Sequence, residues 1–137
     1  MATNNRSDNW NGMNWIRQEK RLAIYLRDGC ACIYCGATLE EGAILSLDHV
    51  KPHVKGGSNS ERNLVTCCKK CNSSRGDRPV EEFAVDVAKY VNHGVTAESI
   101  LASIRSNTRK SIKEFKIQAK EMIARRGSAA KVLAKGV

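Results

Sequence analysis

The sequence predicts one small α+β domain, and three observations support that class. Apolar residues recur at helical spacing in the first third and in the last third of the chain. Between these segments lie two short runs of β-type residues, at 44–47 and at 63–66. The chain has 137 residues, of which 42% are hydrophobic, so it is long enough for one domain with a core of its own.

The N-terminal half is expected to hold one helix and the two strands. Apolar residues at helical spacing predict the helix over residues 15–27. The first β-type run leads directly into Asp48 and His49. Pro52 and the glycine- and serine-rich segment 56–60 then mark a loop before the second run.

The C-terminal half is expected to be helical. Pro79 precedes a helix that extends to about Tyr90. Thr96 is expected to cap a single long helix over 96–126, which Gly127 ends. A loose basic tail is expected from there on.

Two Cys-x-x-Cys pairs enclose the middle of the chain and predict a structural zinc site. Each pair directs two thiolates at one ion, and two pairs complete the tetrahedron that zinc prefers. Disulfides and a redox pair are the alternatives, and the N-terminal residues do not have the pattern of an export signal that would favour disulfides. Cys30 and Cys67 lie beside the pairs, so a shifted register is conceivable, but we expect both to be buried as small apolar residues. The expected zinc ligands are Cys32, Cys35, Cys68 and Cys71.

Asp48 and His49 lie between the two pairs, and Asn72 directly follows the last cysteine. Asp48 offers a carboxylate oxygen and Asn72 a carbonyl oxygen, which are ligands that suit Mg²⁺ or Mn²⁺. His49 suits a general base, because histidine titrates near neutrality. On its own an Asp-His pair is usually a surface turn, but this spacing predicts a second, catalytic metal site for phosphodiester hydrolysis.

Several motifs occur together in an order that is typical of one nuclease family. Over about residues 15–83 the chain resembles the HNH endonucleases of the ββα-metal class, in the cysteine-bearing form with a double knuckle. Asn72 stands where the family name has its last histidine, so the chain is similar to the His-Asn-Asn variant. The motifs are Arg27-Asp28-Gly29, Cys32-x-x-Cys35-Gly36, Leu47-Asp48-His49-Val50-x-Pro52, Gly56-Gly57, Asn63-Leu64-Val65 and Cys68-x-x-Cys71-Asn72.

The resemblance implies a small ββα-metal module with a four-cysteine zinc knuckle, flanked by an N-terminal helix and a C-terminal helical extension. It implies that His49 is the base, that Asp48 and Asn72 hold the catalytic metal, and that Asn63 orients the base or braces its loop. The products would carry 5′-phosphate and 3′-hydroxyl ends. His53 is a further candidate metal ligand, with phosphate contact and plain solvent exposure as the alternatives.

The distribution of charge predicts a polyanionic partner. The formal net charge is +9, and residues 105–137 hold ten Lys or Arg against two Glu, which gives this segment +8. A basic extension beside a nearly neutral body suits nucleic acid, with an ordinary solvated helix face as the alternative. The resemblance assigns phosphate contacts to two arginines near the second cysteine pair. The expected nucleic-acid-binding residues there are Lys69, Lys70, Arg75 and Arg78.

Together these features predict a metal-dependent endonuclease that hydrolyses duplex DNA with weak sequence preference. The expected ions are Zn²⁺ in the structural site and Mg²⁺ or Mn²⁺ in the catalytic site, and a phage, mobile-element or restriction-type context fits so compact a chain. A zinc-knuckle nucleic-acid-binding protein without catalysis is the alternative, and an RNA-directed nuclease is a third possibility. The sequence leaves open whether one or two strands are cut, and whether the protein is a monomer or a homodimer.

The chain is expected to have three regions. These are a flexible N-terminus (1–13), the nuclease domain with its zinc knuckle (14–92) and a basic C-terminal helix and tail (93–137). Apolar stretches are shorter than the roughly 18–20 residues of a membrane span. We therefore expect a cytoplasmic protein without a membrane partner.

Overall fold

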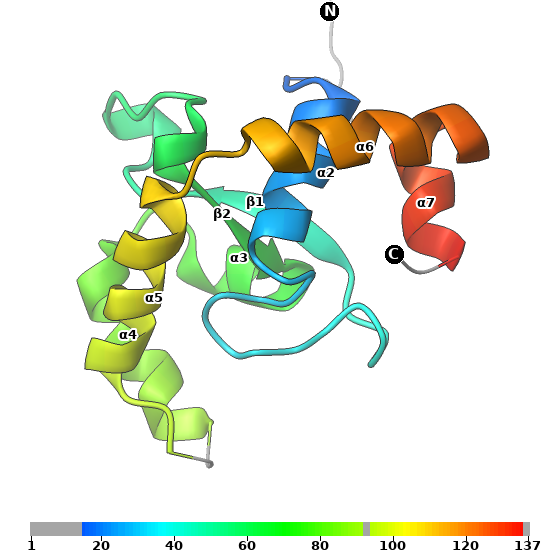
Figure 1. Ribbon diagram of the computed structural model, residues 1–137. Coiled ribbons are helices and arrows are strands. Elements are labelled where there is room, and N and C mark those ends of the chain that lie inside the picture. The colour runs from blue at the N-terminus through cyan, green and yellow to red at the C-terminus, as the bar shows by residue number, and fades with distance from the viewer. Residues whose placement is uncertain (1–14, 92–93, 136–137) are drawn as a thin grey trace, which may run out of the picture.

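The fold is a two-stranded antiparallel sheet with helices on both faces (Figure 1). The computed structural model describes residues 15–91 and 94–135, so the expected flexible segment 1–13 lies outside the described residues. The predicted α+β class is confirmed. The elements are α2 (Gln18–Arg27), β1 (Leu45–His49), the 3₁₀ turns η1 (His53–Lys55) and η2 (Glu61–Asn63), β2 (Leu64–Cys68), α3 (Lys69–Arg75), α4 (Val80–Tyr90), α5 (Ala97–Arg109), α6 (Lys113–Arg126) and α7 (Ala129–Lys135).

Both predicted strands exist, and they pair with each other. The register places Leu45 opposite Cys68 and His49 opposite Leu64. Each strand begins one residue later than the sequence pattern indicated, and β1 therefore includes both Asp48 and His49. The helix α3 starts directly after β2, so the predicted ββα unit is present.

Two hydrophobic cores cover the two faces of this sheet. On one face Leu45, Leu47 and Leu64 pack in one cluster with apolar residues of α2, α6 and α7. On the other face Val65 and Cys67 pack with α4 and α5. Figure 1 shows the same division, with α4 and α5 at one side of the molecule and α6 and α7 at the other.

A buried ion pair fastens the end of α2 to the second strand. The Arg27 guanidinium donates to the carboxylate of Asp28 at 2.7 Å and to the backbone carbonyls of Leu64 at 2.7 Å and Glu61 at 2.9 Å. The same carboxylate accepts the backbone N–H of Thr66 at 2.8 Å. Because the charged groups find partners within the protein, their burial is tolerated and the position of β2 on α2 is fixed.

The prediction of one long helix over 96–126 is wrong. The Thr96 cap is present and forms a capping box with Ser99, but the helix ends at Arg109 and α6 begins after a break. The physical reason is that the apolar residues of this segment are buried in two different hydrophobic cores. Ile104 is buried with α4 on one face of the sheet, whereas Ile112 is buried with α2 on the other. A single straight helix does not reach both cores.

The expected loose tail after Gly127 is also wrong. Gly127 ends α6 with a left-handed φ of 96°, as expected, but α7 follows at once. Val132 of α7 is 2% exposed, and the N–H of Ala129 donates to the Gln18 side chain at 2.9 Å. This short helix therefore belongs to the core around α2. Within the described ranges, none of the helices is long and apolar enough to cross a membrane.

Candidate functional site

Four thiols gather at one end of the sheet, as the sequence predicted. Their sulfur atoms all lie within 4.8 Å of one another, and those of Cys35 and Cys68 are 3.7 Å apart. A tetrahedral zinc site with bonds of about 2.3 Å has edges of about 3.8 Å, so the spacing fits zinc. In each pair a backbone N–H also points at a sulfur, from Cys35 to Cys32 and from Cys71 to Cys68.

The protonation of this cluster also fits a cation. A hydrogen bond from the Cys71 thiol lowers the pKa of Cys32 to about 5, and the same hydrogen bond raises the pKa of Cys71. Burial raises the pKa of Cys35 to about 11. Without a cation the raised pKa values of Cys35 and Cys71 favour the thiol form of these two residues, whereas a divalent metal would stabilise thiolates. Cys30 and Cys67 are buried in the hydrophobic clusters, in agreement with their expected role.

A cleft of about 670 Å³ runs along the unpaired edge of β1. All five residues of β1 line it, although their side chains alternate between the two faces of the sheet. Its other walls come from α3, the η1 turn, and α2 together with the segment before it. The candidate residues Asp48, His49, His53, Lys69 and Asn72 all line this one cleft.

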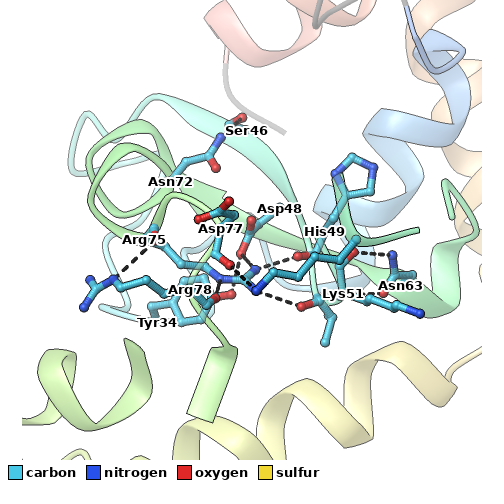
Figure 2. A network of polar contacts seen from close by, with 12 residues as sticks. Tyr34, Ser46, Asp48, His49, Lys51, Asn63, Asn72, Arg75, Asp77 and Arg78 are labelled. Carbon is cyan, nitrogen blue, oxygen red and sulfur yellow. Dashed lines mark hydrogen bonds and ion pairs between the residues drawn. The ribbon is translucent and has the colours of Figure 1, made fainter. Parts of the chain in front are cut away.

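Asp48 is a buried carboxylate that is held by two donors (Figure 2). It is 5% exposed, and its Oδ2 accepts from the phenol of Tyr34 at 2.5 Å and from Nη1 of Arg75 at 2.7 Å. Burial and the charge of Asp48 raise the pKa of Tyr34, so the phenol is a donor throughout the range in which proteins are folded. Both bonds use Oδ2, which leaves Oδ1 as the oxygen that is available to a cation in the cleft.

Asn72 lies on the neighbouring helix α3 and lines the same cleft as Asp48. Its Nδ2 donates to the hydroxyl of Ser46 at 3.1 Å. Ser46 and Asp48 are two residues apart on β1, so both side chains are on the same face of the strand. Because the amide nitrogen is engaged, the amide oxygen of Asn72 is free to act as a ligand. A carboxylate and an amide oxygen that line one cleft fit a hard divalent cation such as Mg²⁺.

His49 projects to the opposite face of the strand, and Figure 2 shows its ring turned away from Arg75. The ring lies 4.9 Å from that of Trp15 and 5.8 Å from that of His53, measured between centroids. Its Nε2 is 2.8 Å from the Oδ1 of Asn59. Since an amide oxygen only accepts, Nε2 carries the proton and Nδ1 holds the lone pair that a general base requires.

Asn63 braces the loop that follows His49 and does not contact the imidazole. Its Oδ1 accepts the N–H of Lys51 at 2.8 Å, and its Nδ2 donates to the carbonyls of Lys51 and Ser58 at 3.1 and 2.8 Å. Glycine is required at position 57, where the loop passes close to Lys51, because a Cβ there would lie 1.8 Å from the Lys51 carbonyl oxygen. Of the two tasks that the resemblance offered for Asn63, its contacts favour bracing the loop.

The expected phosphate-binding residues fall into two groups. Lys69 and Lys70 are exposed at the start of α3. Arg75 is 1% exposed, and it also donates to the carbonyls of His49 and Val50. Arg78 pairs with Asp86 at 2.6 Å. Arg75 and Arg78 therefore have partners within the protein, whereas the exposed side chains of Lys69 and Lys70 are accessible to a ligand.

Four residues of the site carry no sequence signal that singles them out. Tyr34 occupies a turn between two cysteines, Trp15 reads as the start of a helix, and Asn59 reads as one more polar loop residue. Asp77, which lines the cleft beyond α3, follows a glycine and reads as a turn. Their proximity to Asp48 and His49 is tertiary, so no local pattern relates them to the site.

Comparison with known proteins identifies the part of the chain that holds the four cysteines and most of the cleft residues. Residues 32–86 match the family model described as HNH endonuclease. Relatives include CRISPR-associated endonuclease Cas9 of Actinomyces naeslundii, 42% identical over 65 residues, and that of Corynebacterium diphtheriae, 31% identical over 80 residues. These matches cover 47% and 58% of this chain but 6% and 7% of the relatives, so the chain spans a small part of their length.

A solved structure is also similar. The crystal structure of the Type II-C Cas9 enzyme from Actinomyces naeslundii aligns with a TM-score of 0.42 and 23% identity, over 75% of this chain and 12% of that chain. The family match and the relatives support nuclease activity at a general level.

Proposed function

Because residues 32–86 match the HNH endonuclease family, we propose that this chain is a divalent-metal-dependent nuclease that hydrolyses phosphodiester bonds of duplex DNA. The observation that carries the proposal is the arrangement along the edge of β1. Asp48 and Asn72 present oxygen ligands, and His49 presents a basic nitrogen, in one cleft. This is the donor set that metal-assisted hydrolysis requires.

His49 takes the proton from the attacking water. The hydrogen bond to Asn59 fixes the tautomer, and contact with the Trp15 ring restricts rotation of the imidazole. A base that is held in one orientation and one tautomer loses little entropy on reaching the transition state. The hydrogen bonds of Asn63 also help to hold the base in position, because they fix the segment that begins directly after His49.

Asp48 and Asn72 would hold the catalytic cation. When bound, the cation supplies positive charge to the scissile phosphate and to the leaving oxygen. The Arg75 guanidinium lies 2.7 Å from Oδ2 and offsets part of the negative charge of Asp48. Two protein ligands, one of them neutral, would bind Mg²⁺ or Mn²⁺ weakly by themselves, so phosphate oxygens of the substrate would be needed as further ligands.

The basic residues that face solvent would bind the DNA backbone. Lys69 lines the cleft at the start of α3, and Lys70 is exposed beside it. Further exposed lysines lie on α6, at Lys113, Lys116 and Lys120. Contacts of this kind do not depend on base identity, so we expect weak sequence preference and strong dependence on salt.

The test is nicking of supercoiled plasmid DNA in the presence of Mg²⁺ or Mn²⁺. We expect the wild type to cut and His49→Ala to lose at least about 100-fold in rate, because general base catalysis contributes about 10²–10⁴. The control is Tyr90→Ala, which alters a side chain that is 82% exposed on α4 and should leave the rate unchanged.

Three outcomes separate the candidate functions. Equal cutting by the wild type and His49→Ala would refute the assigned base. DNA binding without any cutting would favour a zinc-knuckle binding protein. Preference for structured RNA over duplex DNA in a competition assay would make the chain an RNA-directed nuclease.

A further inference from the structure

Tyr34 connects the two predicted metal sites of the molecule. It stands between Cys32 and Cys35 in the sequence, and its side chain reaches Asp48 (Figure 2). The residue is 1% exposed, and its phenol donates to Oδ2 of Asp48. One residue of the first knuckle therefore contacts the carboxylate to which the proposed function assigns the catalytic cation.

The knuckle turn sets the position of the Tyr34 ring. The turn is closed by the N–H of Gly36, which donates to the carbonyl of Cys32 at 2.9 Å. It is attached to β2 by the N–H of Ile33, which donates to the carbonyl of Thr66 at 2.9 Å. Since both sides of the turn are fixed, the backbone of Tyr34 has little freedom of its own.

Packing fixes the ring itself. The Phe83 ring meets it edge to face, with centroids 4.9 Å apart and an angle of 76° between the planes. Phe83 belongs to α4 and is 3% exposed. Contact from α4 therefore holds the phenol in the direction of Asp48.

The two donors on Oδ2 determine how the carboxylate of Asp48 is turned. Arg75 and Tyr34 both bond to that oxygen, at 2.7 and 2.5 Å. With one oxygen held by two donors, the plane of the carboxylate is fixed and Oδ1 keeps one direction. Groups that hold a ligand in this way commonly change metal affinity by about 10–100-fold when they are removed.

We propose that Tyr34 is a positioning residue, which transmits the geometry of the zinc knuckle to Asp48 and so sets the affinity of the catalytic site for its divalent cation. This inference rests on the proposed function, because it takes Asp48 as a cation ligand. It adds a task for the knuckle beyond holding the fold together. The knuckle also orients a ligand of the second site.

The test compares cation binding with and without the phenolic hydroxyl. Tyr34→Phe keeps the ring and its contact with Phe83 but removes the donor. Both it and a control are made in a His49→Ala background, so that a short DNA duplex is bound without being cut. Mn²⁺ binding is then measured by electron paramagnetic resonance of the free ion, and zinc content by elemental analysis.

We expect Tyr34→Phe to retain one zinc ion per chain and to raise the Kd for Mn²⁺ about 10-fold. The matched control is Tyr25→Phe, which also removes a fully buried hydroxyl but from the core under α2. Its hydroxyl bonds to Arg21 and to the carbonyl of Leu45, so the Kd for Mn²⁺ should not change.

The outcomes distinguish the inference from the function on which it rests. If the parent binds Mn²⁺ and Tyr34→Phe binds it equally well, the inference is overturned and the proposed function stands. If Tyr34→Phe loses its zinc or its fold, Tyr34 is a structural residue and the inference is overturned as well. If the parent itself binds no Mn²⁺, both are overturned.

Discussion

Replacement of Arg75 by methionine should destabilise the protein more than any other change of a single basic residue near α3. The side chain is 1% exposed, and its guanidinium makes four hydrogen bonds. One reaches the carboxylate of Asp48, and three reach the carbonyls of His49, Val50 and Arg78. Arg75→Met keeps most of the apolar stem and removes every one of these donors.

The expected loss is about 4 kcal/mol in the free energy of unfolding. Removing one partner of a buried ion pair costs about 3–5 kcal/mol, because the other charge stays buried without compensation. Some of the freed carbonyls can turn to water at the cleft, so their contribution is not added in full. A small domain has about 5–15 kcal/mol in total, so the variant should be folded but marginal.

The measurement is urea denaturation with saturating zinc, followed by circular dichroism. With a slope of about 2 kcal/mol per molar urea, the midpoint should fall by about 2 M. The control is Arg62→Met at an exposed position of η2, which should shift the midpoint very little. The double variant with Asp48→Asn should lose less than the sum of the single variants, by about 1–3 kcal/mol.

Two results would refute this reasoning. A loss below about 1 kcal/mol for Arg75→Met would mean that the ion pair with Asp48 does not hold the buried segment together. Full additivity in the double variant would mean that the two charges act independently despite their 2.7 Å separation.

Three further predictions concern the loop, the base and the knuckle. Gly57→Ala should destabilise the protein by about 1–3 kcal/mol and slow nicking, because the added Cβ would lie 1.8 Å from the Lys51 carbonyl oxygen. Thermal unfolding measures the loss of stability, and plasmid nicking measures the loss of rate. Asn59→Asp should move the acid limb of the pH–rate profile up by about 1 unit, since a carboxylate beside Nε2 favours the charged imidazolium of His49, and the base must be neutral to act. Cys71→Ser should lose zinc and unfold at a lower temperature, whereas His49→Ala should keep its zinc and its melting temperature while it stops cutting; elemental analysis and calorimetry distinguish them.

Each of these predictions has a control variant or a result that would contradict it. Gly56→Ala serves as the loop control, because its left-handed φ of 88° costs about 1 kcal/mol but a Cβ there meets only the Lys51 amine at 4.0 Å. If Gly56→Ala and Gly57→Ala behave alike, the close approach of Gly57 is not what matters. An acid limb that stays in place in Asn59→Asp would remove Asn59 from the environment of the base. Full zinc content in Cys71→Ser would exclude this cysteine as a ligand.

The parts of the site that were predictable from the sequence are those with a fixed local spacing. Each cysteine pair is a turn of its own, so the four thiols could be identified, and the fold brings their sulfur atoms together. The two short strands were predictable because β-type residues are flanked by turn residues. Asp48 and His49 were singled out through their order among these motifs, and both line the cleft.

The parts that could not be predicted depend on contacts between distant segments. The apolar spacing continues through residues 110–112, so the break between α5 and α6 is visible only when Ile104 and Ile112 are seen in different cores. A basic residue on a short helix reads as a surface residue, and the burial of Arg75 follows only from the presence of Asp48 across the strand. Tyr34 is hidden for the same reason, because nothing local relates it to a residue fourteen positions later.

The edge of β1 carries the candidate chemistry because the two faces of the sheet are already occupied. Alternation along the strand sends His49 to the face that packs on α2 and Asp48 to the face that packs on α3 and α4. The two groups are therefore held by different cores, His49 through Trp15 and Asp48 through Tyr34 and Arg75. A third strand at this edge would fill the cleft, and the buried ion pair at Asp48 makes such pairing unfavourable. Within the described residues the sheet has two strands, so the edge of β1 stays open and the proposed base and the proposed cation ligand line one cleft.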